Sequence, residues 1–302
     1  MALGGTTAAA PEAVVREQEV TPKVAQSSRS RSPATRIRIR TPQKLWNQQQ
    51  QWQDVVDKAT AGLEALCLEH GIPESHGLGH AKRALAHADC ALKADVSVLP
   101  LRALAVRLAA LLHDADDRKY FKGSVVGNFV NARRLGAEAG APPAVLAEVN
   151  KMISLVSCSK NGNHVPEDVK GEPEWLYPRW ADRLEATGEI GVVRSWQYNR
   201  EVGVPMSCGT TPRPTSEAEV WSLATQERFA EYQRSGGSSK SMMDHYYDKL
   251  LRVARPDYAS VCNAYLEAEM DKRAAPLVEI CLTFGRTGEV PVDRIQQMVV
   301  NV

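Results

Sequence analysis

Residues 104–119 read LAVRLAALLHDADDRK, an apolar segment that ends in a His-Asp pair. The run from Leu104 to Leu112 predicts a helix that is buried against its neighbours. A charged pair that closes a buried helix needs a partner, because an uncompensated charge is costly in apolar surroundings. A bound divalent cation would meet that need at His113 and Asp114, since it compensates the carboxylate and accepts a neutral imidazole.

Apolar residues recur at spacings of three and four on both sides of this segment, which is the period of amphipathic helices. One such period starts at Leu45 and should end near Gly71. The same period predicts further helices over 78–93, 100–116, 124–139, 143–157, 174–198, 216–234, 241–254 and 258–284. No alternating series typical of strands separates them, so we expect an all-α fold arranged as a helical bundle.

Several segments lack this period. The Pro-, Gly- and Thr-rich stretch 203–215 and the Ser-Gly-Gly-Ser-Ser run at 235–239 predict loops. Residues 1–43 are rich in Ala, Thr, Ser, Pro and Arg, which predicts a disordered tail. An organelle transit peptide is the alternative for this tail, although Glu12, Glu17 and Glu19 count against it. We therefore expect a single domain over residues 44–302.

The 302-residue chain carries 37 Lys and Arg residues against 36 Asp and Glu residues, and this balance argues against nucleic-acid or membrane-surface binding. The longest apolar stretches are too short to span a bilayer, and the N-terminus lacks the apolar core of a signal peptide. Six scattered cysteines form no Cys-x-x-Cys pair, which argues against a zinc ribbon or a disulfide framework. We expect a cytoplasmic protein, with organelle targeting by the tail as the alternative.

Two further residues are candidate metal ligands. His80 lies on the predicted helix 78–93, and Asp182 lies on the predicted helix 174–198. With His113 and Asp114 they offer two imidazoles and two carboxylates from three helices. Such a mixed shell suits one manganese, magnesium, iron, nickel or cobalt ion better than a structural zinc ion. The alternatives are a core histidine at position 80 and a salt bridge between Asp182 and a neighbouring arginine.

Four motifs, in this order, resemble those of the HD-type metal-dependent phosphohydrolases, whose signature is a His, a His-Asp doublet and a distant Asp. In this sequence the motifs are Ser75–Arg83, Leu111–Lys119, Ala181–Gly191 and His245–Leu251. The resemblance spans roughly residues 45–285. Departures from the pattern are Gly77 in place of Asp, Tyr246 in place of Phe, and the segments 157–173 and 201–240, which look like insertions.

The resemblance implies a right-handed all-α core that binds one divalent metal ion through His80, His113, Asp114 and Asp182. It also implies hydrolysis of a phosphate ester or anhydride, most often in a nucleotide, including cleavage of a nucleoside triphosphate to a monophosphate and pyrophosphate. Metal ions support such chemistry by activating water and polarising a phosphoryl oxygen.

Further side chains receive roles from their positions near these motifs. Asp117 shares a helix face with His113 and is the candidate for proton transfer, while His76 is expected to contact the substrate or order a water. The candidate phosphate-binding side chains are Arg83, Lys119, Arg194, His245 and Lys249. The alternatives are a surface ion pair for Asp117 and an amphipathic face that packs on the core for the segment around 245–249.

Two other functions fit the sequence less well. A catalytically silent module would keep the metal site and bind a nucleotide or a protein through residues 201–240. Such a module would not need the charged side chains of Asp117, Arg83 and Lys119. A di-iron oxygenase on a helical core would need more His or Asp ligands than the four candidates. We therefore expect a phosphorylated small molecule as the partner, and neither a membrane nor a nucleic acid.

Overall fold

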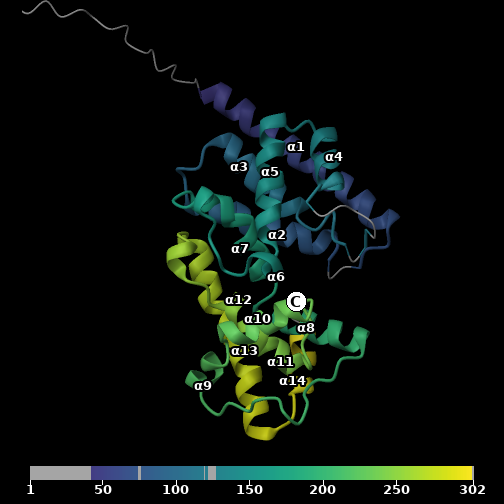
Figure 1. The fold of residues 1–302 in the computed structure, drawn as a ribbon. Coiled ribbons are helices and arrows are strands. Elements are labelled where there is room, and N and C mark those ends of the chain that lie inside the picture. Colours follow the sequence, from purple (N-terminus) through teal and green to yellow (C-terminus); the bar gives the residue numbers. More distant parts are fainter. Residues whose placement is uncertain (1–41, 74–75, 119, 122–126, 301–302) are drawn as a thin grey trace, which may run out of the picture. The chain divides into compact units, whose positions relative to one another are not determined.

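The computed structural model describes residues 42–73, 76–118, 120–121 and 127–300. These residues form helices and loops and contain no strand, which confirms the predicted all-α fold (Figure 1). Residues 43–302 form one compact unit. The α-helices are α1 (Pro42–Glu69), α2 (Leu78–Ala94), α3 (Pro100–Leu112), α4 (Val130–Glu138), α5 (Pro143–Val156), α6 (Cys158–Asn161), α7 (Tyr177–Leu184), α8 (Gly188–Val202), α9 (Glu217–Ser222), α10 (Gln226–Arg234), α11 (Met242–His245), α12 (Leu251–Ala254), α13 (Ala264–Thr287) and α14 (Val292–Val299). Three short 3-10 turns, η1 (Glu167–Val169), η2 (Pro173–Leu176) and η4 (Tyr258–Ser260), and one π-helical turn, η3 (Tyr246–Leu250), complete the list.

Helix α3 is the central element of the first of two hydrophobic clusters, and it packs against α2, α5 and α7. Leu104, Leu108, Leu111 and Leu112 are fully buried, as the sequence predicts for this segment. The small alanines between these leucines let three neighbouring helices approach α3 closely. The end of α3 therefore lies inside the protein, and His113 follows it directly.

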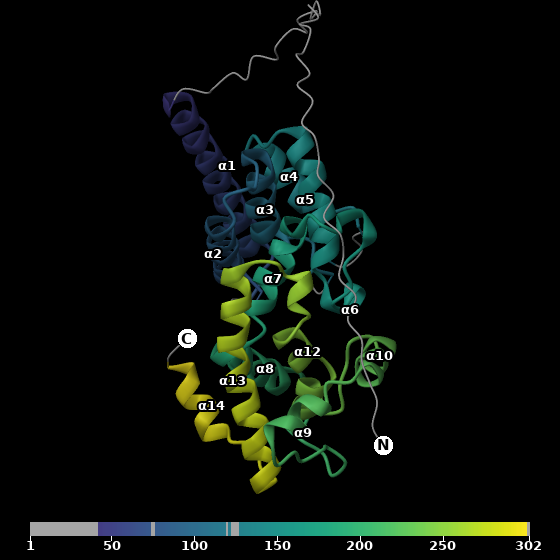
Figure 2. The same ribbon diagram turned by 90° about the vertical axis from the view of Figure 1, so that its left-hand side faces the viewer.

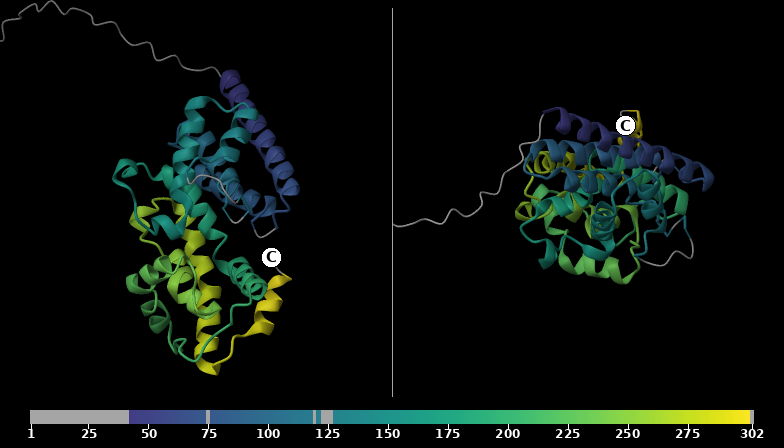
Figure 3. Two further views of the ribbon diagram at one scale, coloured as in Figure 1. Left: turned by 45° about the vertical axis from the view of Figure 1, so that its right-hand side comes forward. Right: turned by 90° about the horizontal axis from the view of Figure 1, so that it is seen from above.

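Helix α1 lies along the outside of this first cluster, as Figure 3 shows from two sides. Its apolar face contributes Val55, Val56, Leu63 and Leu66 to the cluster. This face has the spacing of three and four that predicts an amphipathic helix.

The second hydrophobic cluster is formed by α8, the continuous α11–η3–α12 segment, α13 and α14 (Figure 2). Helix α13 belongs to both clusters, because Leu266 and Met270 are buried in the first while Leu277 and Phe284 are buried in the second. One long helix thus connects the two parts of the unit. In the part of the chain that the structure describes, no helix is long and apolar enough to cross a membrane.

The largest departure from the predicted helices is a break within 174–198. Helix α7 ends at Leu184 and α8 begins at Gly188, whose φ of +70° is a left-handed conformation that glycine adopts without strain. Gly188 and Gly191 therefore lie outside the helix that carries Asp182, contrary to our expectation. Close approach does occur at Gly191, where a Cβ atom would lie 2.3 Å from the carbonyl oxygen of Ala186.

Other boundaries also differ from the prediction. The segment 216–234 forms two helices, because the Thr225 hydroxyl caps a new helix by accepting a hydrogen bond from the Arg228 amide. The segment 258–284 forms the turn η4 and then α13, while α14 is an additional helix that the sequence reading missed. Loops occupy 203–216 and 235–241, close to both predicted loops. Helix α1 begins at Pro42, and residues 1–41 of the predicted tail lie outside the described residues.

Candidate metal centre

Two histidines come together where α2 and α3 pack. His80 lies in the first turn of α2, and only 1% of its side chain is exposed. His113 follows the last residue of α3, and its Nδ1 lies 2.8 Å from the carbonyl oxygen of Ala110. A hydrogen bond donated from Nδ1 leaves Nε2 as the atom that accepts a metal ion. The Nε2 atoms of His80 and His113 are 3.2 Å apart.

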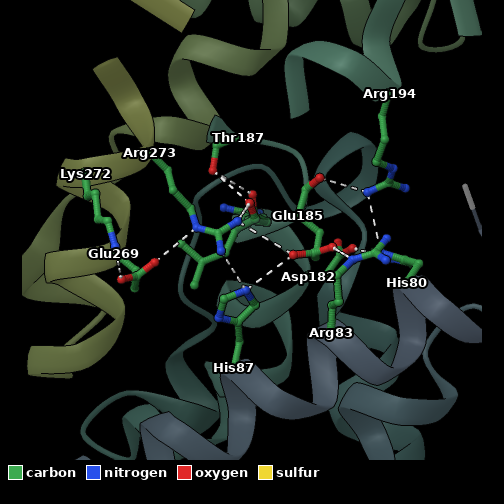
Figure 4. Close-up of polar contacts among 12 residues, drawn as sticks. His80, Arg83, His87, Asp182, Glu185, Thr187, Arg194, Glu269, Lys272 and Arg273 are labelled. Atoms are coloured by element: carbon green, nitrogen blue, oxygen red, sulfur yellow. Dashed lines mark hydrogen bonds and ion pairs between the residues drawn. The ribbon is translucent and has the colours of Figure 1, made fainter. Parts of the chain in front are cut away.

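Two carboxylates complete this group. Asp114 Oδ2 lies 3.7 Å from His80 Nε2 and 3.4 Å from His113 Nε2. Asp182 Oδ1, on α7, lies 3.3 Å from each of the two Nε2 atoms. Figure 4 shows Asp182 facing His80 from the opposite helix. The structure thus brings together the two imidazoles and two carboxylates of the predicted ligand set.

The separations of these atoms fit a metal ion. Metal bonds of about 2.0–2.2 Å to nitrogen and oxygen place neighbouring ligand atoms about 3.0–3.6 Å apart. Within the described residues, the ligand atoms of His80, His113 and Asp114 form a group that could hold an ion, with all atoms within 4.8 Å of one another. Asp182 is outside this group, but its Oδ1 lies 3.3 Å from each Nε2 atom, which makes it the candidate for a fourth ligand.

The charges of the group support binding of a cation. Burial alone would lower the pKa of His113, but the negative charges of Asp114 and Asp182 raise it well above 6.5. Burial alone would raise the pKa of both carboxyls, but the neighbouring His113 lowers them. Both carboxylates therefore stay ionised near neutral pH, and they provide the negative charge that a divalent ion requires.

The arginines beside Asp182 contact other groups. Arg179 donates hydrogen bonds to the carbonyl oxygens of Leu155 and His164. Arg183 donates to Asn163 Oδ1 and to the carbonyl oxygen of Gly162. Both side chains therefore hold the loop before α7, whereas the Asp182 carboxylate faces the histidines. This arrangement favours the metal-ligand interpretation of Asp182 over the salt-bridge alternative.

Arg83, a candidate phosphate-binding residue, is paired with a carboxylate that the sequence reading left without a role. Its Nε donates a hydrogen bond to Glu185, and 39% of the Arg83 side chain is exposed. Glu185 lies at the end of α7 and is 1% exposed. Its position three residues after Asp182, within the third motif, is the signal that could have identified it. A cavity of about 260 Å³ is lined by Arg83, Glu185, Gly188, Glu189, Ile190 and Arg273.

Arg194, on α8, reaches the metal ligands from another side. Its Nη1 donates a hydrogen bond of 2.9 Å to the carbonyl oxygen of Glu185 and lies 3.4 Å from His80 Nδ1 (Figure 4). The predicted phosphate-binding residue Arg194 is therefore adjacent to the candidate metal ligand His80. Lys119, another predicted phosphate-binding residue, lies outside the described residues.

The candidates for proton transfer lie in the turns next to the ligands. The backbone amide of Asp117 bonds to the carbonyl oxygen of Asp114, so the two residues belong to one turn. The rings of His76 and Tyr120 have centres 6.0 Å apart. Burial, and then the charges of Asp117 and Asp114, raise the pKa of Tyr120. Tyr120 therefore lies beside the His76 ring and within electrostatic reach of Asp117 and Asp114, and the sequence did not indicate this residue.

Asp116, next to Asp117 in the sequence, has a structural role. Its carboxylate accepts hydrogen bonds from the amides of Asn131 and Ala132 at the start of α4. The two neighbouring carboxylates thus point to different surroundings.

His245 and Lys249 lie on the α11–η3–α12 segment. Burial and the charge of Lys249 lower the pKa of His245 to about 3, so its imidazole is neutral at pH 7. Burial alone would lower the pKa of Lys249. The charges of Tyr232, Cys158 and Asp182 outweigh this effect and raise the pKa above 10.5, so the ammonium group stays charged. The effect of Asp182 places Lys249 within electrostatic reach of the ligand group.

Tyr232, on α10 of the long segment 201–240, lies next to His245 and Lys249. Its ring centre lies 5.4 Å from that of His245 and 5.9 Å from the Lys249 Nζ. Phe229 stacks on Tyr232 from the same helix. Helix α10 therefore forms part of the surface next to His245 and Lys249, a contact that no motif indicates.

Comparison with known proteins gives the family. No protein-family model matches the chain. It is 35% identical to the uncharacterized protein L803 of Acanthamoeba polyphaga mimivirus over 222 residues, which cover 69% of this chain and 88% of the viral protein. The chain belongs to the same family as this viral protein.

Comparison with solved structures gives a protein of similar fold. A protein of Lactobacillus plantarum has a TM-score of 0.51 and 22% identity to this chain, and the match covers 78% of this chain and 95% of that protein. An HD-superfamily hydrolase of Bacillus thuringiensis has a TM-score of 0.48 and 18% identity, with 76% of this chain and 95% of that protein covered. At such low identity, the likeness to the Lactobacillus protein concerns the fold alone.

Proposed function

We propose that this protein is a metal-dependent phosphohydrolase that cleaves a phosphate ester or anhydride in a nucleotide, with a nucleoside triphosphate as the expected substrate. The observation that carries the proposal is the convergence of His80, His113, Asp114 and Asp182 on one point: the two Nε2 atoms are 3.2 Å apart, and each carboxylate has an oxygen 3.3–3.7 Å from them. A divalent ion at this site would lower the pKa of a coordinated water and polarise a phosphoryl oxygen.

Cationic side chains of this chain would bind the phosphoryl groups. Arg194 lies next to His80, and Lys249 stays charged within electrostatic reach of Asp182. Fixed cations stabilise the negative charge of a phosphoryl group, most strongly where the site excludes water. A substrate with several phosphates would contact both cations, which supports a nucleoside triphosphate over a monoester.

Proton transfer would fall to Asp117, which shares a turn with Asp114 and lies next to Tyr120. A carboxylate at this edge would accept a proton from the attacking water or return one to the leaving group. His76, whose ring lies beside Tyr120, would order the water or contact the substrate. The neutral imidazole of His245 offers one hydrogen-bond donor to a phosphate oxygen.

The proposal is tested by incubating the purified protein with a panel of nucleotides and with manganese, magnesium, cobalt, nickel or iron(II), and by identifying products by chromatography. We expect metal-dependent release of phosphate or pyrophosphate, abolished in Asp182→Ala and retained in Asp57→Ala, which removes an exposed carboxylate on α1. A wild-type protein that binds metal but releases neither product from any nucleotide would refute the proposed activity and favour the silent module.

A further inference from the structure

Glu185 is a buried carboxylate one turn after the candidate ligand Asp182. Its side chain is 1% exposed and lies at the end of α7, between α2 and α13 (Figure 4). A buried carboxylate is costly unless charged or polar partners surround it. The identity of these partners indicates what Glu185 does.

The partners of the Glu185 carboxylate come from two helices. From α2, Arg83 Nε donates a hydrogen bond to Oε2, and His87 Nε2 lies 3.3 Å from Oε1. From α13, Arg273 Nη1 lies 3.6 Å from Oε1. The ring of His87 is held on its other side by Tyr265, whose hydroxyl lies 2.7 Å from Nδ1. One carboxylate therefore joins three helices.

Two of these helices also carry metal ligands. His80, Arg83 and His87 are spaced by three and four residues, so they lie along one face of α2. Asp182 and Glu185 are three residues apart on α7. The contact between His80 and Asp182 and the contact between Arg83 and Glu185 therefore run side by side between the same two helices. A shift at the second contact would change the spacing at the first.

The backbone of Glu185 makes a second connection to the ligands. Its carbonyl oxygen accepts a 2.9 Å hydrogen bond from Arg194 Nη1, which lies 3.4 Å from His80 Nδ1. Groups that orient a metal-binding histidine tune its affinity for the ion. Glu185 thus fixes the position of α2, and its backbone carbonyl holds the Arg194 guanidinium beside the His80 ring.

We propose that Glu185 is a positioning residue of the metal centre: by joining Arg83, His87 and Arg273 it fixes α2 against α7 and holds His80 at ligand distance from Asp182. This inference rests on the proposed function, because it assigns Glu185 to the same metal site. Glu185 itself contacts neither the ion nor the phosphate. Arg83, in this arrangement, supports the site mainly through Glu185.

The test compares Glu185→Gln with a matched control, Glu269→Gln. Glu269 also pairs with Arg273, at 3.2 Å, but it pairs in addition with Lys272, which lies on the same helix and not on α2 (Figure 4). Manganese or cobalt binding to the full chain is measured by titration calorimetry, together with the melting temperature without metal. We expect Glu185→Gln to bind the ion roughly 10–100-fold more weakly, the usual effect of losing an outer group that orients ligands. Glu269→Gln should bind it as the wild type does.

A second variant keeps the test decisive if Glu185→Gln does not fold. Glu185→Asp retains the charge with a shorter side chain, so its affinity should lie between those of the wild type and of Glu185→Gln. The visible spectrum of bound cobalt in this variant should also differ from the wild-type spectrum, because the ligand geometry changes. Folded variants with wild-type affinity and an unchanged cobalt spectrum would overturn the inference. A wild type that binds no ion would instead refute the proposed function, and the inference with it.

Discussion

The charge of Glu185 should make the stability of this protein depend on pH in a way that one variant can isolate. Burial alone would raise the pKa of this carboxyl, but hydrogen bonds from His87 and Arg83 and their charges lower it from 4.5 to about 2. A lowered folded-state pKa means that the ionised carboxylate stabilises the folded protein. This stabilisation is fully present above pH 4.5 and is lost as the pH falls toward 2.

The size of the effect follows from the shift. A lowering from 4.5 to about 2 corresponds to about 3 kcal/mol of stabilisation at neutral pH. At pH 3.5, where an unfolded Glu is mostly protonated, about 1–1.5 kcal/mol of that contribution has been lost. The glutamine of Glu185→Gln has no titrating group. The difference in the free energy of unfolding between wild type and variant should therefore decrease by this amount from pH 7 to pH 3.5.

The assay is urea unfolding of both proteins at pH 7 and pH 3.5, in the presence of a chelator so that release of metal does not contribute. Titrating groups that do not contact residue 185 are common to the two proteins and cancel in the comparison, so the remaining difference reports on Glu185 and its partner His87. Glu269→Gln serves as the control, because this carboxylate is 21% exposed and should show a smaller change of the gap. If the free energies of unfolding of wild type and Glu185→Gln differed by the same amount at the two pH values, the ionised Glu185 carboxylate would not stabilise the folded protein as we infer.

Three further changes test other parts of the molecule. Asp117→Asn should lower turnover roughly 10²–10⁴-fold with metal content unchanged, as expected when a positioned acid or base is lost; loss of the metal would show that Asp117 supports the ligands instead. Lys249→Met should reduce kcat/KM roughly 10–100-fold, because a charge-assisted hydrogen bond to phosphate contributes about 1.5–3 kcal/mol; unchanged kinetics would exclude Lys249 from the substrate site. Gly285→Ala should lower the free energy of unfolding by about 1–3 kcal/mol, since its Cβ would lie 1.7 Å from the carbonyl oxygen of Pro214; chemical denaturation measures this, and an unchanged midpoint would contradict it.

The sequence predicted the parts of the fold and of the site that depend on local patterns. The apolar run from Leu104 to Leu112 is buried as its composition requires, and α3 ends where the charged pair begins. The order of His80, His113-Asp114 and Asp182 predicted a group that the structure brings together. Such residues are predictable because the residues that define a helix face or a motif are only a few positions apart in the sequence.

Features that depend on distant partners were not predictable in this way. Arg83 and Glu185 are 102 residues apart in the sequence, so their ion pair can be recognised only in the folded structure. Tyr232 reaches His245 from a segment with no recognised motif. The break between α7 and α8 depends on the left-handed backbone of Gly188, whereas the apolar period continues through it and suggests one helix.

The proposed binding of one divalent ion by His80, His113, Asp114 and Asp182 can be tested by measuring bound manganese in the wild type and in Asp182→Ala. Elemental analysis after equilibration with the ion and removal of excess gives the ratio of metal to protein. We expect about one ion per chain in the wild type and nearly none in the folded variant, because two imidazoles and a single carboxylate leave the shell incomplete. A folded Asp182→Ala protein that retained one ion per chain at wild-type affinity would contradict it.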